Sequence, residues 1–361
     1  MKNTTTPRVF IAATRQNDGK TTTSLGLIAA LQKKFPRIGY IKPVGQRFVE
    51  IEEQKIDEDT VLMDSVYRLN CPLVDMSPIA VEPDFTRKYL QAANNDALVR
   101  KINDAFDRVS WEKDFVLCEG SGHAGVGAVF DLSNAQVAKH LGCKVIIVSR
   151  GGIGKPIDEV ALNQALFEKE GVEIIGVIIN KVLPEKADFI ADFARRGLKR
   201  KGLDLLGVIP HQPMLSSPTL DSIREELDAE VLNTPENIHG LVDDVIVGAM
   251  SAANALKFFK RGVLLITPGD REDILAAAAA SEIRKMAGIV LTGGIKPGNG
   301  LLRSLRNMKI PVLLANDDSY VVASKVHDLI VKTRPADAEK ISLIRDIIAK
   351  NVNVKKIIES L

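Results

Sequence analysis

A glycine, a lysine and two threonines stand together near the start of the chain. They are Gly19, Lys20, Thr21 and Thr22, and they lie between the apolar run 9–13 and a segment with the spacing of a helix. A tight loop and a helix N-terminus aim backbone N–H groups at one point, where the peptide dipoles also favour negative charge. The lysine can reach the β and γ phosphates of a nucleotide, and a threonine hydroxyl can ligate a bridging magnesium ion. The sequence therefore predicts a loop that binds ATP with magnesium.

The strict form of this motif fails at one position. It requires a glycine five residues before Gly19, and Thr14 stands there. An ordinary capped helix start with a solvated lysine stays open as the alternative, because a bare Gly-Lys-Thr also arises by chance. The order of strand, loop and helix is what phosphate binding needs, so we favour the phosphate loop.

A carboxylate follows the apolar segment 115–118. This is Glu119, and Gly120 and Gly122 come directly after it. An acid at the end of a buried strand, followed by turn glycines, suits a magnesium ion or its water shell beside a phosphate loop. A plain strand-to-loop junction explains the glycines but leaves the acid unexplained.

Two other strand ends carry polar side chains. Lys42 follows the apolar segment 38–41 and enters a Pro/Gly turn. In an open α/β sheet, ligands bind at the carboxyl ends of strands, so Lys42 is placed to meet a second phosphate or an acidic substrate. A surface turn lysine is the alternative. Asn180 ends a later strand, where its amide can pair with a purine edge or can serve an ordinary turn. The acidic segment 50–64 offers several carboxylates, and spacing alone selects none of them.

Apolar runs alternate with helix-like segments through most of the chain. This predicts an α/β fold with a parallel sheet and helices on both faces. Residues 71–94 contain three prolines and are predicted to form a long irregular connection. A second, smaller α/β series begins near residue 213. The predicted domains are residues 1–212, residues 213–330 and a helical tail over residues 331–361.

The second series has two strand-to-helix junctions that could bind an anion. One contains Asp270 and Arg271, and the other contains Thr292, Gly293 and Gly294. Neither has the lysine and hydroxyl that a magnesium nucleotide needs. We therefore predict a ligand site of another kind in the second domain.

Composition limits the classes of partner and the compartment. The chain has 361 residues with 48 Lys and Arg against 46 Asp and Glu, a net charge of +2 that argues against nucleic-acid binding. A basic cluster over residues 195–201 is the exception, and a solvated helix end explains it. Three widely spaced cysteines suggest neither disulfides nor zinc, and no apolar run approaches the length of a membrane span. We expect a cytoplasmic protein with no membrane partner.

The first 210 residues resemble the dethiobiotin synthetase type of P-loop domain. Its loop has the form G-T-x-x-x-x-G-K-T, and residues 13–21 keep that spacing with alanine in the first place. Further matches are Lys42 with its following proline, Asp59 before a helix, Glu119 with its glycines, and Asn180. Residues 216–320 resemble a DRTGG domain. The order of the two is similar to the N-terminal half of long phosphotransacetylases.

The resemblance implies roles for individual residues. It implies that Lys42 faces a substrate, that Asn180 touches adenine, and that Lys20, Lys42 and Glu119 are the catalytic residues. It also implies a metal site formed by Thr21, Asp59 and Glu119. The residues implied to hold the nucleotide are Thr14, Asn17, Asp18, Gly19, Lys20, Thr21, Thr22 and Asn180. Members of both domain types suggest a dimer.

Our leading hypothesis is an ATP-binding protein with a ligand-sensing DRTGG domain, acting as a regulator or a slow ATPase. The alternative is a ligase that uses magnesium ATP to activate a carboxylate or carbamate, with Lys42 neutralising the acyl phosphate. A structural partner-binding protein is a third possibility. A small-molecule acid or effector is the expected partner. In phosphotransacetylases the acetyl-transfer domain follows the DRTGG domain, so we expect no acetyl transfer from this chain alone.

Overall fold

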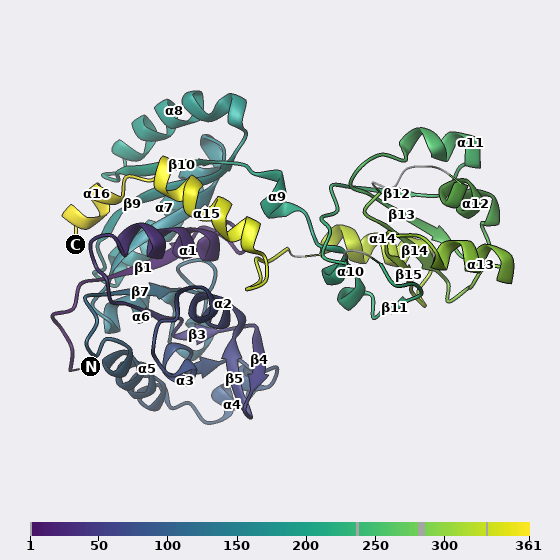
Figure 1. Cartoon of the computed structure of the whole chain (residues 1–361). Helices are drawn as coiled ribbons and strands as arrows, with labels where there is room; N and C mark the ends of the chain where they lie inside the picture. The colour runs from purple at the N-terminus through teal and green to yellow at the C-terminus, as the bar shows by residue number, and fades with distance from the viewer. Residues whose placement is uncertain (1, 236–237, 281–285, 330) are drawn as a thin grey trace. The chain divides into compact units, whose positions relative to one another are not determined.

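The computed structural model describes residues 2–235, 238–280, 286–329 and 331–361 and divides the chain into two compact units. The first unit is Met1–His211 with Thr333–Leu361, and the second is Gln212–Lys332. The second unit is thus inserted before the last segment of the first. Most of the segment that the sequence analysis set apart as a tail, residues 331–361, belongs to the first unit (Figure 1).

The first unit contains a six-stranded sheet in the order β10-β9-β8-β1-β7-β2, with every neighbouring pair parallel. Its central strands are apolar and buried on both faces, as parallel strands covered by helices must be. The parallel α/β fold predicted from the sequence is confirmed. The strands are β1 (Arg8–Ala13), β2 (Ile38–Ile41), β7 (Phe115–Glu119), β8 (Lys144–Arg150), β9 (Ile174–Val182) and β10 (Leu205–Pro210).

The direction in which successive strands are added to the sheet reverses during the chain. From β1 to β2 the chain moves one way along the sheet, and from β7 through β8 and β9 to β10 it moves the other way. Right-handed crossovers then place α1 on one face and α6 to α8 on the other, and Figure 1 shows α1 with α15 in front of the sheet. The loop after β1 lies where the strand order reverses, which is where open α/β sheets bind ligands. The helices are α1 (Lys20–Leu31), α6 (Asn134–His140), α7 (Gly154–Lys169) and α8 (Ala187–Lys199), joined at the chain end by α15 (Ala338–Asn351) and α16 (Val354–Glu359).

Small elements fill the connection between β2 and β7. The irregular connection predicted over residues 71–94 is wrong in part, because short elements form between its prolines. The segment before it contains a two-stranded hairpin whose end leads directly into α2. In chain order the elements are β3 (Val44–Gly45), β4 (Phe48–Ile51), β5 (Gln54–Asp57), α2 (Glu58–Tyr67), α3 (Leu73–Met76), β6 (Ile79–Ala80), α4 (Phe85–Gln91) and α5 (Asn95–Val109).

The C-terminal helix α15 packs directly on α1, the helix that follows the phosphate loop. Gly26 makes this approach possible, since a Cβ atom there would lie 2.2 Å from Ile348 Cγ1. The ring of Tyr67 lies under the guanidinium of Arg345 at 5.1 Å, which ties α2 to the same helix. Residues 333–361 are therefore part of the core that supports the loop.

Replacing Gly26 by alanine is expected to destabilise the first unit by about 1–3 kcal/mol, because the new methyl group overlaps Ile348. The roughly 1 kcal/mol that alanine gains over glycine in a helix offsets part of this cost, so the net loss should lie toward the lower end of that range. Denaturant unfolding measures the change. Adding Ile348→Ala should relieve the overlap, so the double variant should lose less than the sum of the two single variants. An additive result would contradict the packing of α15 on α1.

The second unit is a five-stranded sheet in the order β11-β15-β14-β13-β12, parallel except for β11. Apolar cores form on its two faces, one under α11 to α13 and one under α10 and α14. A short helix, α9 (Pro213–Ser216), precedes it. The strands are β11 (Glu230–Val231), β12 (Asp244–Val247), β13 (Val263–Pro268), β14 (Gly288–Thr292) and β15 (Val312–Leu314), and the helices are α10 (Leu220–Glu226), α11 (Ala252–Ala255), α12 (Glu272–Ala280), α13 (Asn299–Arg306) and α14 (Ser319–Asp328).

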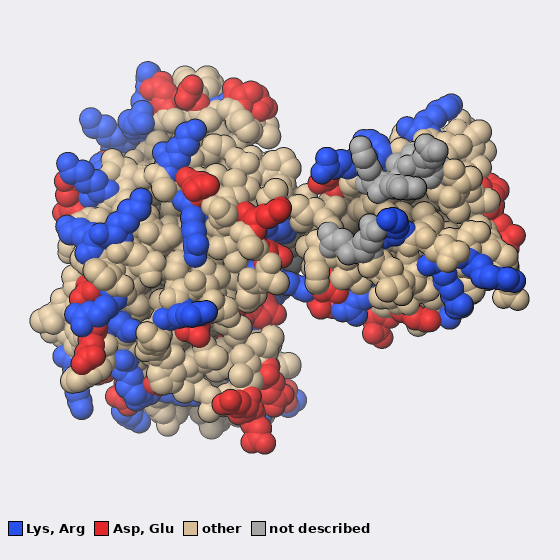
Figure 2. Space-filling model, viewed as in Figure 1, with Lys and Arg blue, Asp and Glu red and all other residues tan. Residues whose placement is uncertain are grey.

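Charged side chains of both signs are scattered over the face of the first unit that Figure 2 shows. The basic cluster 195–201 lies at the end of α8, where Arg196 pairs with Asp192 at 2.8 Å and also lies over the ring of Phe193. Its placement matches the predicted helix end. Among the described residues, no helix combines the length and apolar character that crossing a membrane requires.

Candidate functional site

The loop between β1 and α1 is held by its own side chains. Thr14 Oγ1 donates to Asp18 Oδ2 at 2.7 Å, and the Arg15 N–H donates to the same oxygen at 2.8 Å. The Thr14 hydroxyl also lies 3.1 Å from Ser149 Oγ on β8. Burial raises the pKa of Asp18, and the hydrogen bond from Thr14 opposes that effect. Thr14 and Asp18 thus fix the shape of the loop from within.

Two side chains of strand β9 donate hydrogen bonds to backbone carbonyls of the same loop. Asn180 Nδ2 donates to the carbonyl of Asp18 at 2.8 Å, and Asn180 Oδ1 accepts from the Lys181 N–H at 2.8 Å. Lys181 Nζ donates to the carbonyl of Asn17 at 2.7 Å. The amide predicted to touch adenine therefore positions the loop, and its contact with adenine stays a prediction.

The start of α1 presents backbone donors. Its first intrahelical bond runs from the Thr23 N–H to the Gly19 carbonyl at 2.9 Å, so the N–H groups of Lys20, Thr21 and Thr22 have no acceptor within the helix. No side chain caps this end, and its first turn has no acid. Gly19 has a φ of 101°, and a Cβ atom there would lie 2.1 Å from Asn180 Nδ2. The position requires glycine, and the helix end suits an anion.

Lys20 lies half-buried at this helix end. Burial lowers the pKa of its ammonium, and the nearby Glu119 opposes that shift, while Lys42 adds to it. An ammonium whose charge is disfavoured by desolvation and by a second lysine gains from a bound anion. The geometry therefore fits the role in phosphate binding that the sequence predicted.

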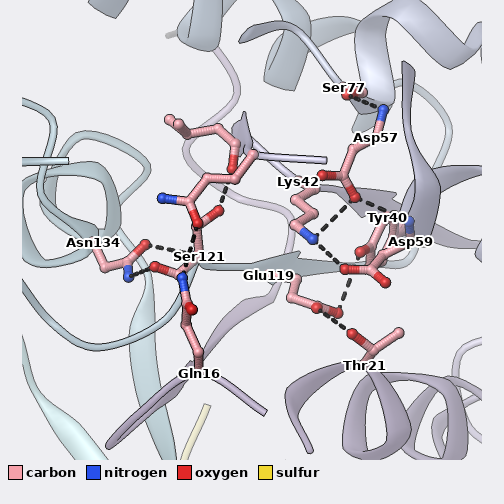
Figure 3. A network of polar contacts seen from close by, with 12 residues as sticks. Gln16, Thr21, Tyr40, Lys42, Asp57, Asp59, Ser77, Glu119, Ser121 and Asn134 are labelled. Atoms are coloured by element: carbon pink, nitrogen blue, oxygen red, sulfur yellow. Dashed lines mark hydrogen bonds and ion pairs between the residues drawn. The ribbon is translucent and has the colours of Figure 1, made fainter. Parts of the chain in front are cut away.

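Glu119 lies fully buried at the end of β7, beside α1 (Figure 3). Its Oε1 accepts from Thr21 Oγ1 at 3.0 Å, and its Oε2 accepts from Tyr40 OH at 3.2 Å. Burial raises the pKa of Glu119, Asp59 raises it further, and Lys42 opposes both. A buried carboxylate of this kind is compensated when a cation lies next to it.

Lys42 is buried between two carboxylates, so the alternative of a surface turn lysine is wrong. Its Nζ lies 2.9 Å from Asp57 Oδ1 and also pairs with Asp59 Oδ2. Burial acts to lower the pKa of Lys42, but Asp59 and Asp57 outweigh it and raise the pKa above the ordinary value for lysine. In this structure Lys42 faces acids of its own chain.

Thr21, Asp59 and Glu119, the three residues predicted to hold a metal ion, make different contacts in this structure. Thr21 and Glu119 share a hydrogen bond, and their oxygens are the hard donors that magnesium prefers. The carboxylate of Asp59, in contrast, pairs with Lys42. Over the described ranges, no three His, Cys, Asp or Glu side chains form a ready metal-binding group. The Thr21 and Glu119 pair fits a magnesium ion, Asp59 is paired with Lys42 in this structure, and its place in the metal site stays a prediction.

Several side chains of the site escaped the sequence analysis. Asp57 was only one of several acids in the segment 50–64, and Tyr40 and Asn134 were not singled out. Asn134 accepts from the Ser121 N–H at 3.1 Å and donates to the Ser121 carbonyl at 3.0 Å, which orders the turn after Glu119. A signal for its helix was available, because Ser133 and Gln136 form a capping box.

The predicted residues of the second unit lie at the ends of β13 and β14. Arg271 donates to the carbonyls of Gly248 and Met250 at 3.1 and 2.7 Å and pairs with Asp273. The two junctions lie close together, since a Cβ atom on Gly269 would lie 1.7 Å from the Ile295 carbonyl oxygen.

The second junction is tied into the unit by hydrogen bonds of its own. The N–H groups of Gly293 and Gly294 donate to carbonyls of the residues after β15, and the Thr292 hydroxyl lies 2.7 Å from Ser319 Oγ. Arg271, Thr292, Gly293 and Gly294 therefore hold the loops of this edge together. A ligand site there, with Asp270 included, stays a prediction.

Residues 7–219 match the model of a family described as an AAA domain, and residues 222–329 match that of the DRTGG domain. Phosphate acetyltransferase of Nitratidesulfovibrio vulgaris is 27% identical over 348 residues, which are 92% of this chain and 49% of the relative. That of Pseudomonas putida is 30% identical over 362 residues, 95% of this chain and 50% of the relative. The chain spans about half the length of these relatives.

Solved structures with similar parts include the MinC:MinD complex of Aquifex aeolicus. It is 18% identical, with a TM-score of 0.37, and the match covers 58% of this chain and 83% of that one. The CBS and DRTGG domains of Clostridium perfringens pyrophosphatase are 22% identical, with a TM-score of 0.29 and coverage of 48% and 86%.

These relatives correct the predicted function. They are named phosphate acetyltransferases, at 24–30% identity over most of the chain. The prediction of a regulator or slow ATPase is therefore wrong, and so is the alternative of a ligase that activates a carboxylate or carbamate. The function was predicted wrongly because a phosphate loop indicates which class of ligand is bound but does not determine which reaction takes place.

The resemblance drawn from the loop spacing, the strand ends and the order of the two domains is confirmed. The AAA-domain match alone covers more than half of the 361 residues. The chain belongs to the AAA-domain family of dethiobiotin synthetase-like P-loop proteins, and here that domain is followed by a DRTGG domain.

Proposed function

We propose that this chain takes part in the transfer of an acetyl group to phosphate, as the P-loop and DRTGG part of a phosphate acetyltransferase. The observation that carries the proposal is the similarity to phosphate acetyltransferases through both units in the same order. Since the chain spans about half of those relatives, its role is a contribution to the reaction that the whole enzyme performs.

We further propose that the loop of the first unit binds ATP with magnesium. Three first-turn N–H groups without helical acceptors and the half-buried Lys20 support an anion at this point. Thr21 and Glu119 would hold the magnesium ion, which neutralises phosphate charge when it is bound. Asn180 and Asp18 would keep the loop in shape around the phosphates.

We also propose the partners and the cellular location of this chain. We propose a homodimer that binds a small-molecule acid or effector and neither nucleic acid nor membrane. A cytoplasmic location is supported by the free thiols of Cys71, Cys118 and Cys143, two of which lie 3.7 Å apart without a disulfide.

A chimera tests the proposed role in acetyl transfer. This chain would replace the matched half of the N. vulgaris phosphate acetyltransferase, and acetyl phosphate formation would be measured with the acetyl donor of that enzyme. We expect the folded chimera to form acetyl phosphate faster than the relative's unmatched half alone. The chain by itself is assayed in parallel.

The control for this experiment is the same chimera with an exposed lysine of the first unit changed, Lys33→Ala, which should behave like the parent chimera. A folded chimera that is no more active than the unmatched half alone would contradict the proposal.

A further inference from the structure

Three carboxylates surround one lysine in the interior of the first unit. Lys42 is 7% exposed, and Asp57, Asp59 and Glu119 are 1%, 7% and 0% exposed. Figure 3 shows Lys42 reaching from the end of β2 toward Asp57 and Asp59, with Glu119 beside them. A buried charge is tolerated only when an opposite charge or hydrogen bonds compensate it, so this ammonium stabilises the acids around it.

Asp57 and Asp59 are held differently. Asp57 caps α2, since its Oδ1 accepts from the Asp59 N–H at 2.9 Å, and its own N–H donates to Ser77 Oγ at 3.0 Å. Its Oδ2 is buried and has no hydrogen-bond partner among the described residues. Gly45 leaves room for this oxygen, because a Cβ atom there would lie 2.7 Å from it. Asp57 is therefore held in place by hydrogen bonds through its backbone N–H and its Oδ1, while its Oδ2 makes no hydrogen bond among the described residues.

Asp59 lies in the first turn of α2 and pairs with Lys42 from the side of Glu119 and Thr21. Glu119 and Thr21 offer two oxygens that suit a divalent cation, and the carboxylate of Asp59 would supply a third. The ammonium of Lys42 now satisfies that carboxylate.

We propose that Lys42 is a built-in substitute for a divalent cation, which competes with it for Asp59, and that Asp57 retains Lys42 when Asp59 is released. This inference rests on the proposed magnesium site. The ammonium and the metal ion both compensate the same carboxylate, so only one of them can pair fully with Asp59 at a time. The first unit therefore stays compensated without metal, and a cation binds only by displacing Lys42.

Manganese ion alone, without nucleotide, is the probe for this competition. Its binding to the full chain is followed by electron paramagnetic resonance. Lys42→Met removes the ammonium at similar length, and the double variant Lys42→Met/Asp57→Asn also removes one carboxylate, so its net charge equals that of the parent. Asparagine is as good a helix cap as aspartate, so α2 is preserved. We expect both variants to bind manganese at least ten times more tightly than the parent.

Lys55→Met is the matched control, because Lys55 pairs with Glu82 on the surface of the same unit. It should bind manganese as the parent does. If the folded double variant, checked by circular dichroism, binds manganese no more tightly than the parent, the competition is disproved.

A second measurement uses the parent chain and does not depend on the folding of a variant. Lysine labelling by reductive methylation, mapped by mass spectrometry, should be slow at Lys42. It should rise when manganese is added, because the ammonium then keeps only one of its two carboxylate partners, while labelling of Lys55 should not change. Unchanged labelling of Lys42 at saturating manganese would overturn the inference. ATP binding is measured separately, so a chain that fails to bind ATP removes the proposed cofactor and leaves the manganese result to decide the competition.

Discussion

Replacing Lys20 by alanine is expected to remove the stabilisation that ATP gives to the parent protein. Lys20 stands at a helix end with no acidic residue and no side-chain cap, so its ammonium is the charge that compensates a bound phosphate. At about 100 times the dissociation constant, a ligand stabilises its protein by about 2.7 kcal/mol. For domains of this size each kcal/mol shifts the melting temperature by roughly 2–4 °C. Thermal unfolding with and without ATP measures the loss.

The free protein should tolerate this change, because Lys20 is only half-buried and burial already disfavours its charge. Lys33→Ala is the matched control, since Lys33 is exposed just beyond the end of the same helix. Its ATP-induced shift should equal that of the parent. Equal shifts in Lys20→Ala and the parent would show that the loop does not hold the phosphates.

Replacing Glu119 by glutamine is expected to abolish the additional stabilisation that magnesium provides in the presence of ATP. Burial and Asp59 raise the pKa of Glu119, so the folded protein disfavours its charged form. Above the ordinary pKa of glutamate this lowers the stability of the fold, and the cost disappears as pH falls through the raised pKa. At neutral pH without metal, the variant should therefore be as stable as the parent or slightly more stable.

The advantage of the variant should also shrink as the pH is lowered, because the parent then becomes protonated at Glu119. Asp64→Asn is the control, since Asp64 accepts from the Leu69 N–H near the far end of α2 and an asparagine oxygen can do the same. It should respond to magnesium and ATP as the parent does. A parent-like response in Glu119→Gln would remove Glu119 from the metal site.

Local sequence predicted the parts of the site that lie at strand ends. The loop after β1 follows an apolar strand directly, the carboxylate of Glu119 ends the apolar strand β7, and parallel strands bring such ends to one edge of a sheet. The pairing of Lys42 with Asp57 and Asp59 could not be predicted in this way. It depends on the β4 and β5 hairpin, which folds back and delivers the start of α2 beside the end of β2.

The return of the chain end to the first unit was also beyond local reasoning. The apolar stripe of residues 338–351 predicts a helix, but it does not say which surface that helix covers. The close approach of Ile348 to Gly26 decides this, and it joins residues far apart in the sequence. The reaction could not be predicted for a different reason. The loop, its lysine and its acid determine how an anion is bound, and enzymes with many different reactions share them.

The most direct test of the site is a structure of this chain with magnesium and a non-hydrolysable ATP analogue. We predict the phosphates within hydrogen-bond distance of the first-turn N–H groups of α1 and of Lys20 Nζ, with magnesium between Thr21 and Glu119. An analogue bound elsewhere on the chain, or a loop left empty at saturating analogue, would contradict the assignment of this loop as the nucleotide site.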